Sequence, residues 1–156
     1  FWNSTVIAVV AILLTAGVPA YQSFVQNVRA ATASSNLTSA LAYARSEAVR
    51  RSIDVELCGG APPSCSADWA QGWFVRPADA PQEAANVLRE WPELGTTALI
   101  ATTPLSSDRV RYSPTGQRMG GNVTFSIQPV TCSGKAVRVI AVGITGRAAN
   151  SRVACP

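Results

Sequence analysis

The sequence contains no histidine and a single lysine, Lys135, among its 156 residues. The absence of histidine excludes histidine acid–base catalysis, Ser-His and Cys-His nucleophile pairs and histidine-ligated metals. Charge is also scarce, because 14% of the residues are charged while 47% are hydrophobic, and this composition is too apolar for a disordered chain. We therefore expect one folded domain that is not an enzyme and that holds neither a cofactor nor a metal.

Acidic residues are missing from both ends of the chain. Residues 1–46 carry two arginines and no acid, and residues 109–156 carry seven basic residues and no acid. All nine acids lie in residues 47–108, where four arginines leave a net charge of −5. The basic C-terminal segment has two interpretations. It forms a surface for a polyanion, nucleic acid above all, or it pairs with the acidic middle segment inside the fold.

An apolar run occupies Val6 to Val18 and is interrupted only by Thr15 and Gly17. As a helix, these thirteen residues span about 20 Å, so they barely cross a bilayer. The run fits a cleavable signal peptide, a buried core helix, or a membrane-lodged helix that continues into a folded domain. The sequence beyond Val18 favours the third identity.

The residues after the apolar run continue the helical pattern. Pro19 predicts a bend, and residues 21–51 contain neither glycine nor proline. We predict one long helix from about residue 2 to about residue 52, hydrophobic over residues 1–24 and amphipathic over residues 25–52. Its apolar stripe comprises Val25, Val28, Thr32, Leu37, Leu41, Ala44 and Ala48.

Residues 53–156 read as a β-rich head, so the fold class is α+β. Short β-type runs alternate with turn signals such as Ser-Pro-Thr-Gly at 113–116. We expect the helix to pack on one antiparallel sheet of five to seven strands, with Trp69, Trp73 and Trp91 filling the space between them. The expected strands are 53–57, 72–75, 86–91, 99–102, 109–113, 123–127 and 136–144.

The four cysteines are Cys58, Cys65, Cys132 and Cys155. None forms a C-x-x-C motif, which disfavours a zinc or redox site. Three disulfide pairings are possible, and we expect Cys58–Cys65 to close a Gly/Pro loop and Cys132–Cys155 to fix the C-terminal tail. Two disulfides indicate a periplasmic or extracellular compartment.

Several motifs in this order resemble those of type IV pilins and type II secretion pseudopilins, in particular the GspH/FimT branch. The apolar stretch, the proline and the long helix before a β-rich head carry the general resemblance. The segments that are similar to the GspH/FimT branch are residues 41–51, 55–58, 69–73, 87–89, 112–116 and 123–125, with Gly146-Arg147 near the end. The resemblance covers nearly the whole chain, and it implies a pilin fold.

The resemblance implies a structural subunit that polymerises through its hydrophobic helix into an extracellular pilus-like filament. The alternative that it implies is a minor pseudopilin of a periplasmic secretion filament. Before assembly the helix would lie in the bacterial inner membrane, and a prepilin peptidase and an assembly platform would act on the chain. Its partners would be further copies or other pilins. The residues expected in the filament core are Phe1, Val6, Ala8, Ala11, Leu14, Gly17 and Pro19.

One feature departs from the family pattern. The family usually has a glutamate in the first helical turn that pairs with a neighbouring N-terminus, whereas here no acid precedes Glu47. The corresponding position is Thr5 when the chains are aligned from the N-terminus, and Trp2 when they are aligned on Pro19. The missing glutamate bears on both the N-methylation of Phe1 and the usual assembly step.

The C-terminal cations suggest a further alternative, a minor pilin that takes up DNA. DNA-binding members of the branch carry a Gly-Arg-x-Arg element, and here Gly146-Arg147 matches while the second arginine is displaced to Arg152. Phosphate contacts of this kind need no base readout, so binding would be weak and salt-sensitive. The candidate DNA-binding residues are Lys135, Arg138, Arg147 and Arg152.

Overall fold

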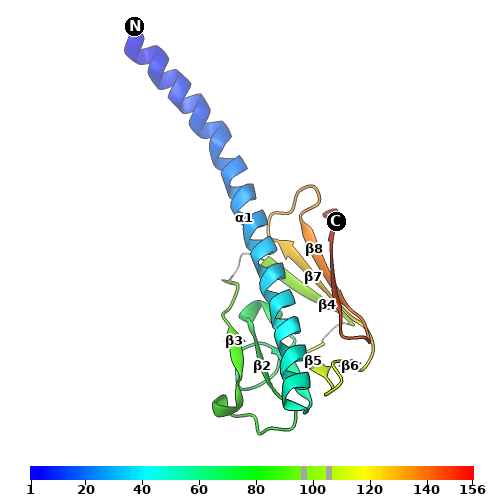
Figure 1. Ribbon diagram of the computed structural model, residues 1–156. Helices are drawn as coiled ribbons and strands as arrows, with labels where there is room; N and C mark the ends of the chain where they lie inside the picture. The colour runs from blue at the N-terminus through cyan, green and yellow to red at the C-terminus, as the bar shows by residue number, and fades with distance from the viewer. Residues whose placement is uncertain (96–97, 105–106) are drawn as a thin grey trace.

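The computed structural model describes residues 1–95, 98–104 and 107–156. Its first element is a single helix, α1 (Trp2–Arg51), with Pro19 inside it. The first half of α1 projects far beyond the head and bends gently along its length (Figure 1), as expected where a proline removes a backbone hydrogen bond. The helix ends at Ser52, whose backbone is left-handed (φ 55°) and whose amide donates to the Val49 carbonyl. The prediction of one long, bent helix is confirmed.

The second half of α1 packs against the head through a stripe of mostly small residues. Alanine supplies most of the stripe, which lets the helix axis approach the strands closely. The predicted stripe is correct from Leu37 onward and wrong before it, because Val28 is 46% exposed while Ala30 is fully buried. Contact with the head starts near Gln26, whose Oε1 accepts from the Thr131 amide at 2.9 Å, but full burial begins only at Ala30. The buried members are Ala30, Ala33, Ser34, Leu37, Ala40, Leu41, Ala44, Glu47 and Ala48.

The strands form two antiparallel sheets rather than the single sheet that we predicted. The five-stranded sheet has the order β3-β2-β1-β5-β6, and the four-stranded sheet has the order β4-β7-β8-β9. Both sheets contact α1, and dividing the strands between them lets each bury one face against the same helix. The strands are β1 (Val55–Gly59), β2 (Trp73–Pro77), β3 (Arg89–Trp91), β4 (Ala98–Thr103), β5 (Arg109–Tyr112), β6 (Arg118–Met119), β7 (Val123–Pro129), β8 (Val137–Val142) and β9 (Ala148–Val153).

Both the strand boundaries and the number of strands differ from the prediction. The first strand begins at Val55 rather than at residue 53, and the expected strand at 86–91 shrinks to β3 because η2 (Ala84–Asn86) is a short 3₁₀ helix. Neither β6 nor β9 was predicted. β9 is an edge strand, and its side chains from Ala149 to Val153 are all exposed, so it lacks the apolar alternation that marks a half-buried strand.

The core between helix and sheets contains the largest aromatic side chains. Trp69, in the 3₁₀ helix η1 (Trp69–Gln71), and Trp73 are fully buried, which confirms the expectation that they fill the interior. The Trp69 ring meets Phe125 of the four-stranded sheet edge to face, with 4.7 Å between centroids. Trp91 lies at the margin of the core, half-buried. The aromatic contact therefore joins the connection between β1 and β2 to the four-stranded sheet.

Both expected disulfides are present. Cys58–Cys65 joins the end of β1 to the following loop, with 4.9 Å between Cα atoms. Cys132–Cys155 joins the loop before β8 to the tail after β9, with 5.8 Å between Cα atoms. The Cys155 amide also donates to the Gly134 carbonyl at 2.9 Å. The C-terminal edge strand is thus held at its far end by a covalent bond and a hydrogen bond.

Candidate functional site: the projecting half of α1 and the α1–β9 groove

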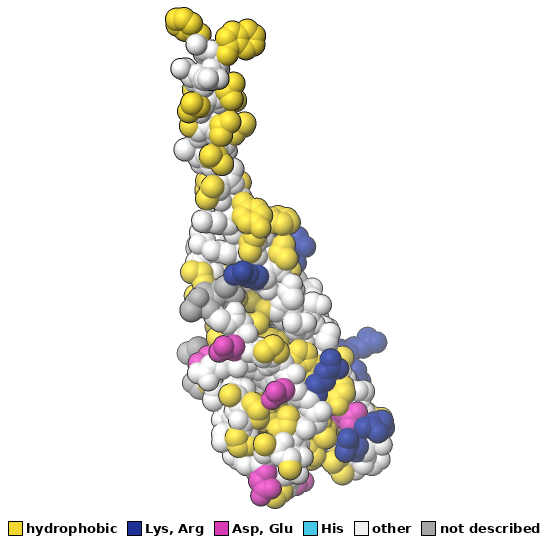
Figure 2. Space-filling model, turned by 90° about the vertical axis from the view of Figure 1, so that its left-hand side faces the viewer, with side chains coloured by type: hydrophobic (Ala, Val, Ile, Leu, Met, Phe, Trp, Pro, Cys, Tyr) yellow, Lys and Arg dark blue, Asp and Glu magenta, His cyan; other side chains and the backbone are white. Residues whose placement is uncertain are grey.

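The described side chains of residues 1–22, which make up most of the projecting half of α1, are all exposed. An 18-residue window of this helix has a mean hydropathy of 2.0, and none of it is buried. The helix is therefore long and apolar enough to cross a membrane. All seven residues that we expected in a filament core are exposed, and Figure 2 shows apolar side chains around this part of the rod. The large apolar residues exposed here are Phe1, Trp2, Val6, Ile7, Val9, Val10, Ile12, Leu13, Leu14 and Val18.

Exposure of this many apolar side chains determines what surrounds the helix. Burying one Val, Leu, Ile or Phe side chain is favourable by about 1.5–3 kcal/mol. For ten such residues the sum is about 15–30 kcal/mol, compared with a small domain's net stability of about 5–15 kcal/mol. Covering the projecting half by lipid or by other proteins would therefore be strongly favourable.

A groove runs between the second half of α1 and the edge strand β9, which we call the α1–β9 groove. Its first part has a volume of about 870 Å³. A second part of about 460 Å³ shares Thr38 with the first. Apolar residues line the first part and serine and threonine hydroxyls the second. The lining of the first part includes Leu41, Ala42, Arg45, Val49, Arg50, Arg147, Ala148 and Ala149, and that of the second includes Ser34, Ser35, Thr38, Ser39, Arg138, Asn150 and Arg152.

Local contacts hold the two walls of the groove in place. Thr38 of α1 hydrogen-bonds to the Asn150 side chain of β9 at 3.2 Å between the two oxygens. Below it, the Arg45 Nε donates to the Gly116 carbonyl at 2.9 Å. Gly146 has a left-handed backbone (φ 77°), and a Cβ there would collide with the Gly116 carbonyl oxygen. Only glycine lets the turn before β9 approach the 113–116 turn and the helix this closely.

Five arginines line the groove, two from α1 and three from β8, β9 and the turn between them. Arg138 of β8 stands directly opposite Arg152 of β9 in the antiparallel register, a like-charge arrangement that disfavours the strand pairing. Burial, followed by the charge of Arg152, lowers the pKa of Arg138, whose Nε is buried without a hydrogen-bond partner. Among the described residues, neither these two arginines nor Arg147 forms an ion pair. The groove therefore presents unneutralised positive charge.

The predicted DNA-binding residues are only partly brought together. Arg138 and Arg152 line the same part of the groove. Arg147 precedes β9 at the other end, five residues or about 17 Å along the strand from Arg152. Lys135 is exposed and is not among the residues that line either part. The structure thus places Arg147 just before β9, Arg152 near the other end of β9 and Arg138 opposite Arg152 on β8, with Lys135 outside the groove.

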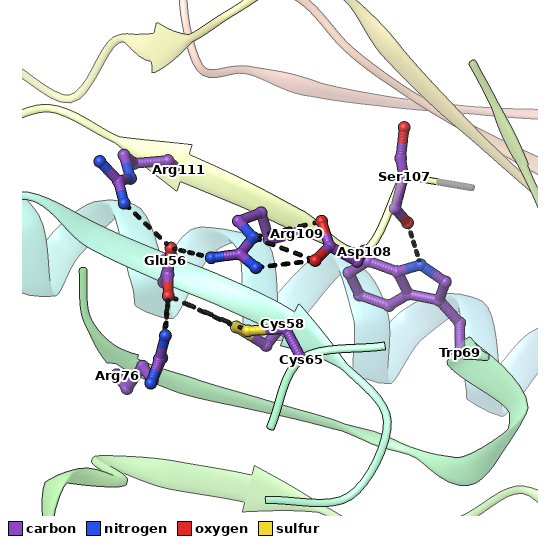
Figure 3. The surroundings of a disulfide bond; sticks show 9 residues. All are labelled: Glu56, Cys58, Cys65, Trp69, Arg76, Ser107, Asp108, Arg109 and Arg111. Carbon is purple, nitrogen blue, oxygen red and sulfur yellow. Dashed lines mark hydrogen bonds and ion pairs between the residues drawn. A yellow bond between two sulfur atoms is a disulfide. The ribbon is translucent and has the colours of Figure 1, made fainter. Parts of the chain in front are cut away.

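An ionic cluster around Glu56 was not predicted. Glu56 is fully buried, and its carboxylate lies among arginine side chains and the sulfurs of the Cys58–Cys65 disulfide (Figure 3). Its carboxylate lies 2.6 Å from the Arg76 Nη2, 3.4 Å from the Arg111 Nη2 and 3.5 Å from the Arg109 Nη1. Asp108 contacts Arg109 at 2.8 Å. In the sequence, the one indication of this ionic cluster was arginine at alternate positions of neighbouring strands.

This cluster belongs to the structure of the head rather than to a metal centre. Glu56, Cys58 and Cys65 place an oxygen and two sulfurs within 4.8 Å of one another. Zinc and similar metals bind cysteine as thiolate, whereas these two sulfurs are joined in a disulfide. The Glu56 carboxylate is instead neutralised by arginine. The cluster accounts for two of the seven C-terminal cations, Arg109 and Arg111, so the pairing interpretation holds for these two.

Comparison with known proteins connects this architecture to one family. A family model described as type II transport protein GspH matches residues 33–146. Two crystal structures of the type IV minor pilin FimU from Pseudomonas aeruginosa are similar in fold, each with 20% sequence identity. One has a TM-score of 0.66 and covers 82% of this chain and 92% of FimU; the other has a TM-score of 0.62 and covers 77% and 90%. No curated protein sequence matches the chain significantly.

Proposed function

The chain belongs to the GspH family, whose members are pilin-like structural subunits, and from this premise we propose that it polymerises through the projecting half of α1 into a type IV pilus. The observation that carries the proposal is the fully exposed apolar helix on a folded, disulfide-bonded head. In the membrane, lipid covers the helix, and its backbone groups are satisfied internally. On assembly, equivalent helices of other subunits replace the lipid.

Small residues on the projecting half support close helix packing. Ala8, Ala11 and Gly17 are exposed on α1, and no atom lies within 4 Å of a Cβ built at Gly17. Small residues allow neighbouring helices in a membrane-like environment to approach closely. A contact between different faces of identical subunits repeats into an open helical filament.

Enlarging the small residues separates assembly from membrane anchoring. Full-length Ala8→Leu/Ala11→Leu keeps its hydrophobicity and is expected to stay in the membrane fraction, but its amount in sheared filaments should fall about tenfold. Val9→Leu/Val10→Leu is the matched control, because it changes side chains that are already large, and it should incorporate normally. Equal incorporation of both variants, or a wild-type chain that never enters filaments, contradicts the proposal.

The compartment of the filament distinguishes a pilus from a secretion pseudopilus. The description of the family model favours a secretion filament, whereas the fold is also that of FimU, a pilus subunit. We favour the pilus, in which the tail held by Cys132–Cys155 and the Gly146-Arg147 turn belong to an exposed head. Antibody labelling of intact cells should then detect the head on surface fibres. Labelling that requires opening of the outer membrane would assign the chain to a pseudopilus.

DNA binding is a second candidate function, favoured by the Arg138–Arg152 pair. Two adjacent guanidinium groups without an acid, one of them with a buried and unpartnered Nε, fit a phosphate group. Trp69 and Trp73 offer no stacking surface, because both are buried. Binding would rest on phosphate contacts from Arg138, Arg147 and Arg152, with Lys135 as an outlying contributor.

Gel-shift titration of the full chain with duplex DNA tests this candidate at two salt concentrations. Three phosphate contacts predict that affinity falls roughly 40-fold between 50 and 200 mM salt. Arg147→Gln/Arg152→Gln should abolish most of the shift, whereas Arg29→Gln, an exposed arginine on α1 outside the groove, should not. No retardation, or retardation unaffected by the groove variant, removes the candidate.

A further inference from the structure

The acidic middle segment leaves a second set of unpaired charges, on the side of the head opposite β9. Among the described residues, Asp79, Glu83, Glu90 and Glu93 are exposed and form no ion pair. Glu90 lies on β3, the edge strand of the five-stranded sheet, Glu93 follows it, and Asp79 and Glu83 lie in the connection between β2 and β3. We call these residues the acidic edge. Figure 2 faces this side of the molecule and shows acidic side chains spread over the head.

The acidic edge and the α1–β9 groove cannot meet within one chain. In Figure 1, β3 lies to the left of α1, whereas β9, the red strand leading to the C-terminus, lies to the right. Each is the edge strand of its own sheet, so each has backbone N–H and C=O groups that no neighbouring strand pairs. The head therefore has opposite charges on opposite sides, each beside an unpaired strand.

We propose that the α1–β9 groove binds the acidic edge of a second copy of this chain. Arg138, Arg147 and Arg152 would face carboxylates of the neighbour, in place of the acids that the groove itself lacks. The contact joins different surfaces of the two copies, so each chain still offers a free groove on one side and a free acidic edge on the other. Such a contact repeats along an open assembly. This inference rests on the proposed filament function and assigns the contact between heads.

The lining of the groove favours a protein over a nucleic acid. Its first part combines cations with the apolar side chains of Leu41, Val49 and Ala148, which a sugar–phosphate backbone cannot use. None of the described residues that line the groove is aromatic, so bases have no platform on which to stack. The acidic edge carries the matching chemistry, because half-buried Trp91 stands between Glu90 and Glu93 and aromatic residues commonly anchor protein interfaces.

The stacking of Arg89 supports the assignment of this edge as a docking surface. Its guanidinium lies over the ring of Trp91, 4.8 Å from the centroid, and over Tyr43 at 5.6 Å. Cation–π contacts of this kind hold the arginine back against the aromatic rings. Arg89 is itself exposed, so the edge carries four exposed carboxylates and one exposed arginine. A basic groove would thus meet a surface on which acids outnumber the single arginine.

Chemical cross-linking between copies tests the contact directly. The full chain carrying Arg147→Lys/Arg152→Lys keeps the charge of the groove and supplies amines that a carbodiimide can join to carboxylates. Unlabelled and ¹⁵N-labelled chains are mixed in lipid vesicles, so that mass spectrometry distinguishes links between copies from links within one. We expect mixed-label links from positions 147 and 152 to Glu83, Glu90 or Glu93. Glu90→Gln/Glu93→Gln, which weakens the contact, should lower the yield of the links to the remaining Glu83 about fivefold.

Two controls make the result decisive. Arg29→Lys places an equivalent amine outside the groove, and the native Lys135 is a further exposed amine; both should link to the acidic edge far less. Links as frequent from either control, or no mixed-label links, overturn the inference. Oligonucleotide bound at the groove with no such links overturns it in favour of nucleic acid.

Energy transfer between labelled copies in the same vesicles separates this inference from the proposed function. If energy transfer is seen and is lost in Ala8→Leu/Ala11→Leu, but no cross-links form, the head contact alone is overturned. Absence of transfer overturns both the head contact and assembly through α1.

Discussion

Two groups of arginines in the same small head have opposite electrostatic surroundings. In the five-stranded sheet, Arg76, Arg109 and Arg111 surround one buried carboxylate, Glu56. In the four-stranded sheet, Arg138 and Arg152 face each other across two strands with no acid beside them. A cation that is paired with an acid inside the fold is part of the folded structure, whereas cations placed side by side without an acid destabilise it. The difference points to the second group as the one that meets a partner.

The largest effect is expected from breaking the paired group. Glu56→Gln removes the charge on which three arginines converge and leaves Arg76, only 3% exposed, without a counter-charge. Removing one partner of a buried ion pair costs about 3–5 kcal/mol. Urea unfolding of the full chain in detergent, followed by the fluorescence of the buried tryptophans, measures this loss. Glu83→Gln, on the exposed acidic edge, should change the free energy of unfolding by less than about 0.5 kcal/mol. A loss below about 1 kcal/mol for Glu56→Gln would contradict the structural role.

The next effect concerns Tyr112, whose hydroxyl is buried in the five-stranded sheet without a hydrogen-bond partner. Burial raises its pKa to about 12, although Arg118 and Arg45 oppose the shift. The pKa of Tyr112 is higher in the folded than in the unfolded chain, so keeping its hydroxyl neutral contributes to the free energy of unfolding. This contribution is fully present below pH 10. It is lost as the pH rises toward 12, and the loss amounts to about 3 kcal/mol. Unfolding measured at pH 9 and pH 11.5 should show this decline in the wild type and much less of it in Tyr112→Phe. An equal decline in both would contradict the assignment.

The smallest effect, opposite in sign, is expected from the unpaired group. Arg152→Gln removes the like charge opposite Arg138, so the head should keep its stability or gain about 0.2–1 kcal/mol. The same urea titration measures the change, with Arg29→Gln as the control for loss of one surface charge. A destabilisation above about 1 kcal/mol would show that Arg152 is paired within the chain, and the contrast between the two groups would disappear.

The helix could be predicted from the sequence because its signals are local. An apolar run, a single proline and about thirty residues without glycine or proline fix α1 almost to its last residue. The disulfide pairs were also predictable, since each joins segments that are close in sequence. The start of the helix–head contact was not, because Val28 and Ala30 fit a helical stripe equally well and only the position of the head decides between them.

The sheets and the groove depend on pairings that no local pattern contains. β1 takes β5 as its neighbour although the two strands are far apart in sequence, and β3 and β4, adjacent in sequence, belong to different sheets. β9 pairs through its backbone, while its side chains are polar or small and exposed. The cations could be listed from the sequence. That Arg138 faces Arg152, and that Arg109 and Arg111 are neutralised, depends on strand register alone.

Electron cryomicroscopy of filaments that contain this chain is the most direct test of assembly through α1. We predict that residues 1–24 of α1 are packed among the helices of other subunits in the filament interior, with the heads outside. If the chain is absent from the filaments, or if this half of α1 is missing or faces solvent within them, assembly through the projecting helix is contradicted.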